Sequence, residues 1–511
     1  MMKRFKILSA LAAVLLSACT EDEMDRINAG YSYPDLSSLN GRFMITDAIV
    51  STGFSASSGD YAYFSSVYCE QTFGTGNREM AQAELRQLSI VSGSATFNNV
   101  WNNVYGNLLN IKYIIDKCGS GGTNDGQKDL LGMAQVLAAV NWGILTDMHG
   151  DIPCSQALRG SALMQPELDR QESVYGHIFA LLDNAIDNLS EAKARGMKNV
   201  GNQDLLYGND NGKWLAAAHA VKARYKLHMM KRDPEAASEA LTEAQAAIDS
   251  GFDGMTLDIY EGTASSMSPW AAFQQSRTSV ACSTTVQSLL RQRNDPREDI
   301  YIYYYTDRVA GVDPSDPPVC AASGDGSAAG LSSPRSLSSP KWLSFSTDGS
   351  SLMYPAVPTD IVPLSETFFI MAELQARGGT DCTDALTAAI ASSFRDMSRF
   401  GDIGVQASDY MASISARVEE NALGEVMVQK YLSQCRDGQV ETFNDIRRCK
   451  ALGEEHVKLT NPCNLDGSAP RFPLRMPYGN SGVSSNPNVR KAYGDGLYIF
   501  TEPVWIYGGE R

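Results

Sequence analysis

The chain has 511 residues and a formal net charge of −16 at pH 7. This acidic balance argues against a nucleic-acid partner, because phosphate binding needs a clustered basic face. Hydrophobic residues make up 43% of the chain and charged residues 20%, as is typical of a globular protein with a large core.

The first residues resemble a signal peptide that ends at a cysteine. Three basic residues precede an apolar run, 7–16, and small residues stand directly before Cys19. A short apolar core indicates a signal peptide, whereas a membrane span needs about 20 apolar residues. The cysteine at the cleavage point is similar to a bacterial lipobox, so we predict removal of 1–18 and a lipid anchor on Cys19. Ordinary secretion with an unmodified Cys19 is the alternative.

Residues 19–32 are polar and acidic and are predicted to form a flexible tether. The remainder, 33–511, is interpreted as a single domain. Nine further cysteines lie in it, and an odd number in an exported chain leaves at least one thiol unpaired. None stands in a C-x-x-C pair, so we interpret most of them as small buried apolar residues.

Helical periodicity dominates this domain. Apolar residues recur at helix spacing in the following stretches, each expected to be a helix: 101–115, 174–189, 214–225, 234–250, 363–377, 383–397, 420–437 and 440–450. The apolar stretch 130–145 is too short for a membrane span and is expected to be a buried helix. Helices joined by short turns predict hairpins stacked as in tetratricopeptide arrays, but with degenerate repeats because no strict 34-residue period is present. The expected fold is therefore mainly α, with little β.

Two segments lack this periodicity and are predicted to be irregular, 53–77 and a long insertion at about 255–360. Both carry unevenly spaced aromatic residues, and a long irregular segment in a compact domain usually binds something. Aromatic rings that a helical core does not explain would serve for stacking on a ligand. We therefore predict a substrate-binding set drawn from both segments: Tyr63, Tyr68, Phe73, Trp270, Arg277, Trp342 and Tyr354. The alternative is that these rings fill satellite cores under long loops.

Motifs that carry catalytic or metal chemistry are missing from the sequence. The five histidines are scattered, with no H-E-x-x-H, and no G-x-S-x-G is present. The stretch 208–213 resembles a P-loop but is one residue short, and Trp214 replaces the required Ser or Thr, so it is interpreted as a surface loop. We expect no catalytic residue, no metal ligand and no cofactor.

Other prominent residues have structural explanations. Trp101, Trp142 and Trp214 lie on apolar helical faces and are expected in the core. Arg447 and Arg448 are expected to pair with carboxylates rather than with substrate.

Six short segments match, in order, the motifs of one known family. They are 150–153, 171–175, 295–297, 365–378, 429–448 and 470–478. Together they resemble the SusD/RagB family of outer-membrane nutrient-binding lipoproteins. Cys154 and Gln156 stand where the family usually has Tyr and Glu, and the Glu often found after the last segment is absent. The acidic run 21–23 is similar to the signal that sends such lipoproteins to the cell surface.

The resemblance implies a substrate-capturing lipoprotein on the outside of the outer membrane, held there only by its lipid. Its implied partner is a TonB-dependent, SusC-like transporter, to which it delivers an oligosaccharide. Aromatic rings that stack on sugars, without catalytic machinery, suit this function. A peptide-binding RagB-like importer subunit is the alternative. A surface enzyme acting on glycans and a helical scaffold for protein partners rank below these two.

Overall fold

The computed structural model describes residues 39–74, 79–277, 280–301, 356–435 and 437–511. Two compact units divide the chain, Met1–Asn40 and Gly41–Arg511, and the description falls almost entirely on the second. The predicted signal peptide, the tether with Cys19, and the predicted ligand residues Trp342 and Tyr354 lie outside the described residues.

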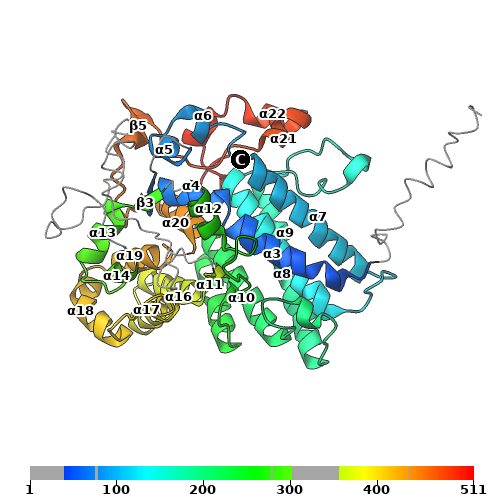
Figure 1. Ribbon diagram of the computed structural model, residues 1–511, viewed down its shortest axis with the longest axis horizontal. Helices are drawn as coiled ribbons and strands as arrows, with labels where there is room; N and C mark the ends of the chain where they lie inside the picture. Colours follow the sequence, from blue (N-terminus) through cyan, green and yellow to red (C-terminus); the bar gives the residue numbers. More distant parts are fainter. Residues whose placement is uncertain (1–38, 75–78, 278–279, 302–355, 436) are drawn as a thin grey trace, which may run out of the picture. The chain divides into compact units, whose positions relative to one another are not determined.

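Long helices make up most of the second unit. They are α7 (Asn98–Cys118), α8 (Lys128–His149), α9 (Gln171–Ala194), α10 (Asn211–His228), α11 (Ala236–Asp249), α16 (Leu364–Arg377), α17 (Thr383–Met397), α18 (Ala407–Glu420), α19 (Ala422–Ser433) and α20 (Gln439–Leu452). Consecutive helices pack as hairpins: α8 against α7 and α9, α10 against α11, and α16 against α17 (Figure 1). The predicted mainly helical, tetratricopeptide-like fold is confirmed.

Helix α8 is the central helix of the first hairpins. By length and composition it could cross a membrane, but 94% of its most apolar window is buried inside the protein. It packs closely on α10: a Cβ on Gly143 would lie 2.0 Å from Cζ of Tyr225, whose hydroxyl donates to the Val140 carbonyl at 3.1 Å. The prediction of a buried helix at 130–145 is confirmed.

The prediction that 53–77 is irregular is wrong for most of its length. After α3 (Ile45–Ser51), a π-helix spans Thr52–Ser57 and α4 spans Asp60–Tyr68. Eight of the nine residues of α4 are buried. A helix that is covered on every side has no polar face, so the periodicity that reveals a surface helix is absent.

The first part of the predicted insertion also holds short elements. They are β2 (Met255–Leu257), α12 (Pro269–Arg277), β3 (Val280–Cys282), α13 (Thr284–Arg291), α14 (Glu298–Tyr301) and β4 (Thr359–Val362). Helices of four to nine residues are too short to show a period, which is why this part reads as irregular. Strands β2 and β4 pair antiparallel and so close the base of the insertion.

The remaining short elements lie before α7 and after α20. They are β1 (Thr72–Gly74), α5 (Glu79–Glu84), α6 (Leu88–Val91), β5 (Leu465–Asp466), β6 (Ala469–Pro470), α21 (Asn480–Ser485) and α22 (Pro487–Tyr493). Within the described residues, the strands form only three two-stranded sheets, β1–β3, β2–β4 and β5–β6. The C-terminal segment is fastened to the end of α8, because Met476 N donates to the Met148 carbonyl at 2.6 Å.

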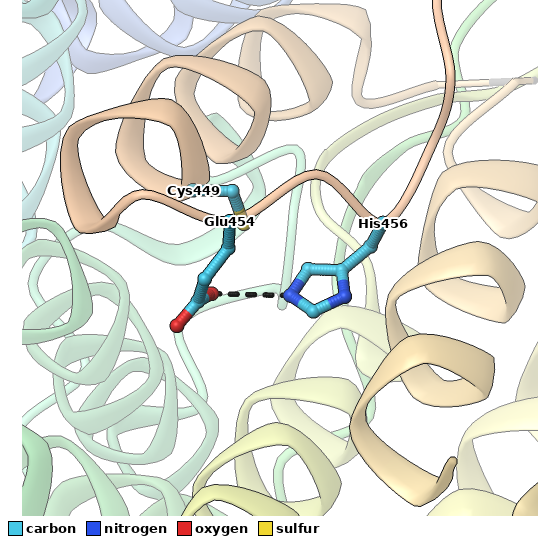
Figure 2. Close-up of side chains that lie close together, drawn as sticks. All are labelled: Cys449, Glu454 and His456. Atoms are coloured by element: carbon cyan, nitrogen blue, oxygen red, sulfur yellow. Dashed lines mark hydrogen bonds and ion pairs between the residues drawn. The ribbon is translucent and has the colours of Figure 1, made fainter. Parts of the chain in front are cut away.

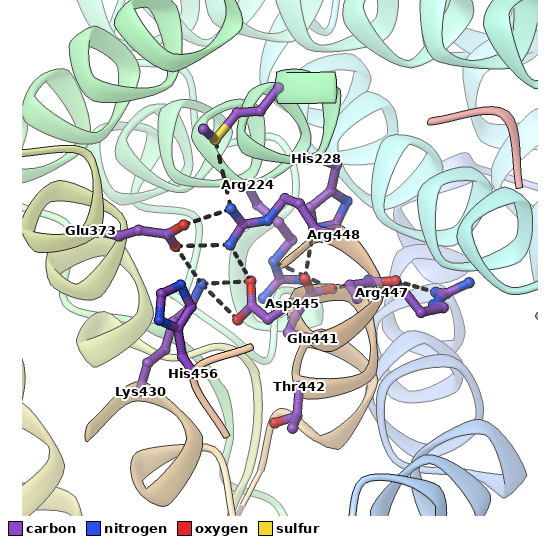
Figure 3. A network of polar contacts seen from close by, with 12 residues as sticks. Arg224, His228, Glu373, Lys430, Glu441, Thr442, Asp445, Arg447, Arg448 and His456 are labelled. Atoms are coloured by element: carbon purple, nitrogen blue, oxygen red, sulfur yellow. Dashed lines mark hydrogen bonds and ion pairs between the residues drawn. The ribbon is translucent and has the colours of Figure 1, made fainter. Parts of the chain in front are cut away.

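Buried ion pairs join the later hairpins around α20 (Figure 3). Arg448 donates to Glu373 of α16 at 2.8 Å and to Asp445, one turn earlier in its own helix, at 2.6 Å. Arg224 of α10 donates to both carboxylate oxygens of Glu366 at 2.6 Å. All of these residues except Arg224 belong to the segments that carry the resemblance to SusD/RagB. Those segments therefore specify how the helices pack.

The predicted carboxylate pairing is confirmed for Arg448 and is wrong for Arg447. Among the described residues, Arg447 donates instead to the carbonyls of Asp147 and Leu474 at 2.8 and 3.1 Å and to Oδ1 of Asn444 at 2.5 Å. The last carbonyl oxygens of a helix, such as that of Asp147 in α8, have no partner within the helix and can accept from a guanidinium.

The tryptophans and most cysteines behave as predicted. Trp101, Trp142 and Trp214 are 5%, 5% and 0% exposed, which confirms them as core residues. Among the cysteines whose side chains the structure describes, seven are free thiols, five of them buried and two, Cys154 and Cys463, half-buried. The P-loop-like stretch is a capped turn, because the Asp210 carboxylate accepts the first backbone N–H groups of α10.

Candidate functional site

The fold brings the two aromatic segments together. Strand β1 of the first segment pairs with β3 of the second, with Phe73 opposite Ala281. Helix α4 lies against α12, so Tyr63 meets Trp270 although 207 positions separate them in the sequence. The prediction drew one set of residues from two distant segments, and five of its members, four of them aromatic, lie among the described residues of this region.

Tyr63 is the centre of an aromatic cluster. Its ring stacks on Phe273 with centroids 4.1 Å apart, and Trp270 meets it edge-on at 4.7 Å. The Tyr63 hydroxyl donates to the Pro269 carbonyl at 2.9 Å. Phe273 was not in the predicted set, although its spacing of three from Trp270 on a helix would have placed both on one face.

These rings are covered by protein. Tyr63, Trp270 and Phe273 are 7%, 7% and 9% exposed. One polar atom in the cluster is unusual: Nε1 of Trp270 is buried and has no hydrogen-bond partner among the described residues. A buried donor without a partner costs about 1–3 kcal/mol. An acceptor that reaches this N–H would form a hydrogen bond and remove that cost.

The other described members of the predicted set have different surroundings. Tyr68 is fully buried at the end of α4, under the guanidinium of Arg86 at 5.1 Å, and burial raises the pKa of its hydroxyl. Phe73 packs with Ala81 and half-buried Leu85 in a small core. Arg277 is the last residue of α12. In this conformation the four described rings present no open face, and their role in ligand binding stays a prediction.

A separate cavity of about 930 Å³ lies between α7, α8, α9 and the loop after α8. Its wall includes Tyr113, which is 37% exposed, and Trp142, which meets His177 edge-on at 6.4 Å. Burial lowers the pKa of His177 and so favours its neutral form. A volume of this size is typical of small-molecule sites. Sequence patterns do not predict this cavity, because Trp142 lies on an apolar helical face and was expected only in the core.

The loop over this cavity is fixed by one carboxylate. Asp169 accepts the backbone N–H groups of Cys154 and Ser155 at 2.9 Å and the Ser155 hydroxyl at 2.6 Å. Cys154 lines the cavity at the position where the resemblance expects Tyr. The smaller side chain leaves volume here that a tyrosine would fill.

One buried group has the residue types of a metal site but the geometry of an ion triad. His228 lies between Asp147, 3.1 Å from Nδ1, and Glu441, 2.8 Å from Nε2 (Figure 3 shows His228 and Glu441). Burial would lower the pKa of His228, but the two carboxylates outweigh it and raise the pKa to about 9. Both ring nitrogens then carry protons and donate to the two carboxylates.

The stacked hairpins and the buried ion pairs define a helical protein of the tetratricopeptide-like class. Within this class, residues 76–478 match the model of the SusD-like family, described as starch-binding and associating with the outer membrane. The match covers most of the chain, and the chain belongs to this family. The resemblance carried by the sequence motifs is confirmed.

Solved structures agree with this assignment. A SusD/RagB family protein from Bacteroides thetaiotaomicron is 34% identical, with 93% of this chain and 100% of that chain covered and a TM-score of 0.78. A chitin-binding SusD homolog from Flavobacterium johnsoniae is 17% identical, with 91% and 98% covered and a TM-score of 0.67. A chitin-binding protein at 19% identity, with 90% and 99% covered, has a TM-score of 0.70. No curated protein matches the sequence.

Proposed function

We propose that this chain is a cell-surface lipoprotein that captures oligosaccharide and delivers it to a TonB-dependent outer-membrane transporter. The observation that carries the proposal is the family match over 76–478, whose description combines starch binding with the outer membrane. Two proteins of the same fold that bind chitin support a glycan as the ligand class. A lipid anchor on Cys19 would hold the domain at the membrane.

The ligand site is proposed at the joined aromatic segments. Tyr63 and Trp270 would form its base, with Trp342 and Tyr354 as further stacking rings. The unpartnered indole N–H of Trp270 supports this location, since a sugar hydroxyl is an acceptor that would satisfy it. Tyr68, Phe73 and Arg277 would support or complete the site.

A glycan array probed with the full chain in mild detergent tests the ligand class. Binding to one oligosaccharide family without turnover of the glycan supports the proposal. Binding to peptides alone favours the RagB-like alternative, and release of shortened sugars favours an enzyme.

Three variants then test the location with the glycan that the array identifies. Trp270→Ala removes ring and N–H and should weaken binding roughly tenfold, since a stacked ring contributes on the order of 1 kcal/mol. Trp270→Phe keeps an aromatic ring but removes the indole N–H, so it measures the contribution of that donor separately from stacking. Tyr113→Ala, at the cavity beside α7, is the matched control and should bind normally. Normal affinity in a folded Trp270→Ala together with weak binding in Tyr113→Ala would move the site to that cavity.

The lipid anchor on Cys19 and the transporter partner are tested separately. Cys19→Ala should give an unprocessed or soluble product, and fatty-acid labelling of that variant would refute the lipobox.

Affinity capture of the chain from mildly solubilised membranes should recover a TonB-dependent barrel. Recovery as a free monomer would count against delivery to a transporter.

A further inference from the structure

The turn that ends α20 gathers three side chains of types that bind metals (Figure 2). Cys449 lies in the last turn of the helix, and Gly453 closes it with a φ of 80°. Glycine adopts this left-handed conformation without strain. The chain then folds back, with Glu454 N donating to the Cys449 carbonyl at 2.9 Å. As a result, donor atoms of Cys449, Glu454 and His456 all lie within 4.8 Å of one another.

These three side chains line one cavity of about 280 Å³. Cys449 is a buried free thiol, whereas the side chains of His456 and Glu454 are 13% and 27% exposed. Nε2 of His456 lies 3.1 Å from Oε2 of Glu454. A solute that enters the cavity therefore meets a sulfur, a nitrogen and an oxygen donor at one end of it.

We propose that Cys449, Glu454 and His456 bind a divalent transition-metal ion of the zinc type. Sulfur and imidazole donors select such ions over calcium and magnesium, which prefer oxygen donors alone. Three protein ligands leave the fourth tetrahedral position to an oxygen donor from the cavity, such as water or a carboxylate. This site goes beyond glycan binding and does not depend on it.

The distances suit a tetrahedral ion. With metal–ligand bonds of about 2.0–2.3 Å, two donors on one ion lie roughly 3.3–3.6 Å apart. The 3.1 Å separation between His456 and Glu454 needs almost no change. The Cys449 sulfur, held within 4.8 Å of the other donors, has to approach by at most about 1.5 Å, which a side-chain rotation in the last turn of a helix can supply.

The carboxylate of Glu454 is already held in place. Arg377 donates to both of its oxygens at 2.7 and 2.8 Å and also to Glu373 at 2.8 Å. Each carboxylate oxygen has two acceptor sites, so Glu454 can bind an ion while it accepts from Arg377. Hydrogen bonds of this kind orient the ligands of most metal sites.

The experiment uses the full chain after treatment with a chelator. Calorimetric titration with Zn²⁺ should show one equivalent bound, and Co²⁺ should produce a thiolate-to-cobalt absorption band. Cys449→Ser should abolish the band and weaken Zn²⁺ binding by more than about tenfold, since even the loss of an outer hydrogen bond costs about 10–100-fold. Cys463→Ser, at a half-buried free thiol that is not one of the three ligands, is the control and should keep both signals.

A wild-type chain that takes up no Zn²⁺, or a cobalt band that persists in Cys449→Ser, would overturn the site. The melting temperature without metal shows whether each variant folds. If Cys449→Ser does not fold, His456→Gln takes its place, because that partly exposed ring can change without opening the core. Its Zn²⁺ affinity should fall by more than about tenfold, and an unchanged affinity would also overturn the proposal.

Discussion

Two buried histidines lie in opposite surroundings, and each represents a different kind of core within the compact unit Gly41–Arg511. His228 lies between two carboxylates in the ion-pair region around α20, and its pKa is raised to about 9. His149 ends α8 among aromatic rings, stacked on Tyr478 at 5.8 Å and edge-on to Trp101 at 5.0 Å. Burial lowers its pKa to about 3, which keeps the ring neutral.

The hydrogen bonds of each histidine agree with its charge. Nδ1 of His149 faces the Met476 carbonyl at 3.2 Å and must carry the proton, so Nε2 accepts from the Tyr61 hydroxyl at 2.5 Å. A charged ring in that position would be disfavoured by the guanidinium groups of Arg475 and Arg447. The ion-pair region joins hairpins through directional charge pairs. The aromatic region joins α4, α7, α8, α12 and the C-terminal segment through packing. The first should respond sharply to loss of one charge, and the second should tolerate loss of one polar atom.

Arg224→Ala should have the largest effect. Arg224 is 3% exposed and donates to both oxygens of Glu366, so its removal leaves a carboxylate buried without its partner. Such losses cost about 3–5 kcal/mol. Denaturant unfolding measures the change. Arg195→Ala, at the exposed pair with Glu191, is the control and should cost less than about 0.5 kcal/mol. Similar losses in the free energy of unfolding for the two variants would mean that the buried pair stabilises the fold no more than the exposed pair does.

His149 should make stability depend on acid. Its pKa is lower in the folded chain than the ordinary 6.5, so the unfolded chain binds the extra proton between pH 6.5 and about 3. Stability from this group is complete above pH 6.5 and falls as the pH drops through that window, by at most about 1.4 kcal/mol per pH unit. His149→Gln should flatten this part of the curve. If the free energy of unfolding falls with the same slope below pH 6.5 in the variant, a group other than His149 causes the loss of stability in acid.

His228 should make the stability of the folded chain depend on pH above 6.5. Its pKa is higher in the folded chain, so its contribution is complete below pH 6.5 and is lost as the pH rises through about 9. Besides Asp147 and Glu441, the Tyr175 hydroxyl faces the ring, 3.2 Å from Nδ1. Unfolding measured from pH 6 to 9 should show a decline in the wild type, again below about 1.4 kcal/mol per unit, that His228→Gln removes. A decline that survives in the variant would refute the assignment.

The same contrast explains what could be predicted from the sequence. Helix α16 was placed within one residue, as 363–377 against Leu364–Arg377, because it has a periodic apolar face and two glycines after it. Helix α4 was missed because it is buried on every side and carries no such period. Pattern reading detects elements that lie between core and solvent, and it loses those that lie wholly inside.

For the site, the sequence could group residues but could not place them. It linked Tyr63 with Trp270 through shared composition, and the two rings do touch. It could not show that both are covered, since burial depends on how α4 and α12 pack. The group formed by Cys449, Glu454 and His456 matches no familiar spacing, because its geometry depends on the backbone turn at Gly453.

Tyr63→Phe should have the smallest effect on stability. It tests whether the aromatic region tolerates the loss of one polar atom. It removes the hydroxyl that donates to the Pro269 carbonyl at 2.9 Å but keeps the ring that stacks on Phe273. A neutral hydrogen bond contributes about 0.5–1.5 kcal/mol, and no charge is left unpaired. Denaturant unfolding should therefore show a loss near 1 kcal/mol, several times below that of Arg224→Ala. A loss as large as that of Arg224→Ala would mean that the aromatic cluster depends on this one polar contact, and the distinction between the two cores would fail.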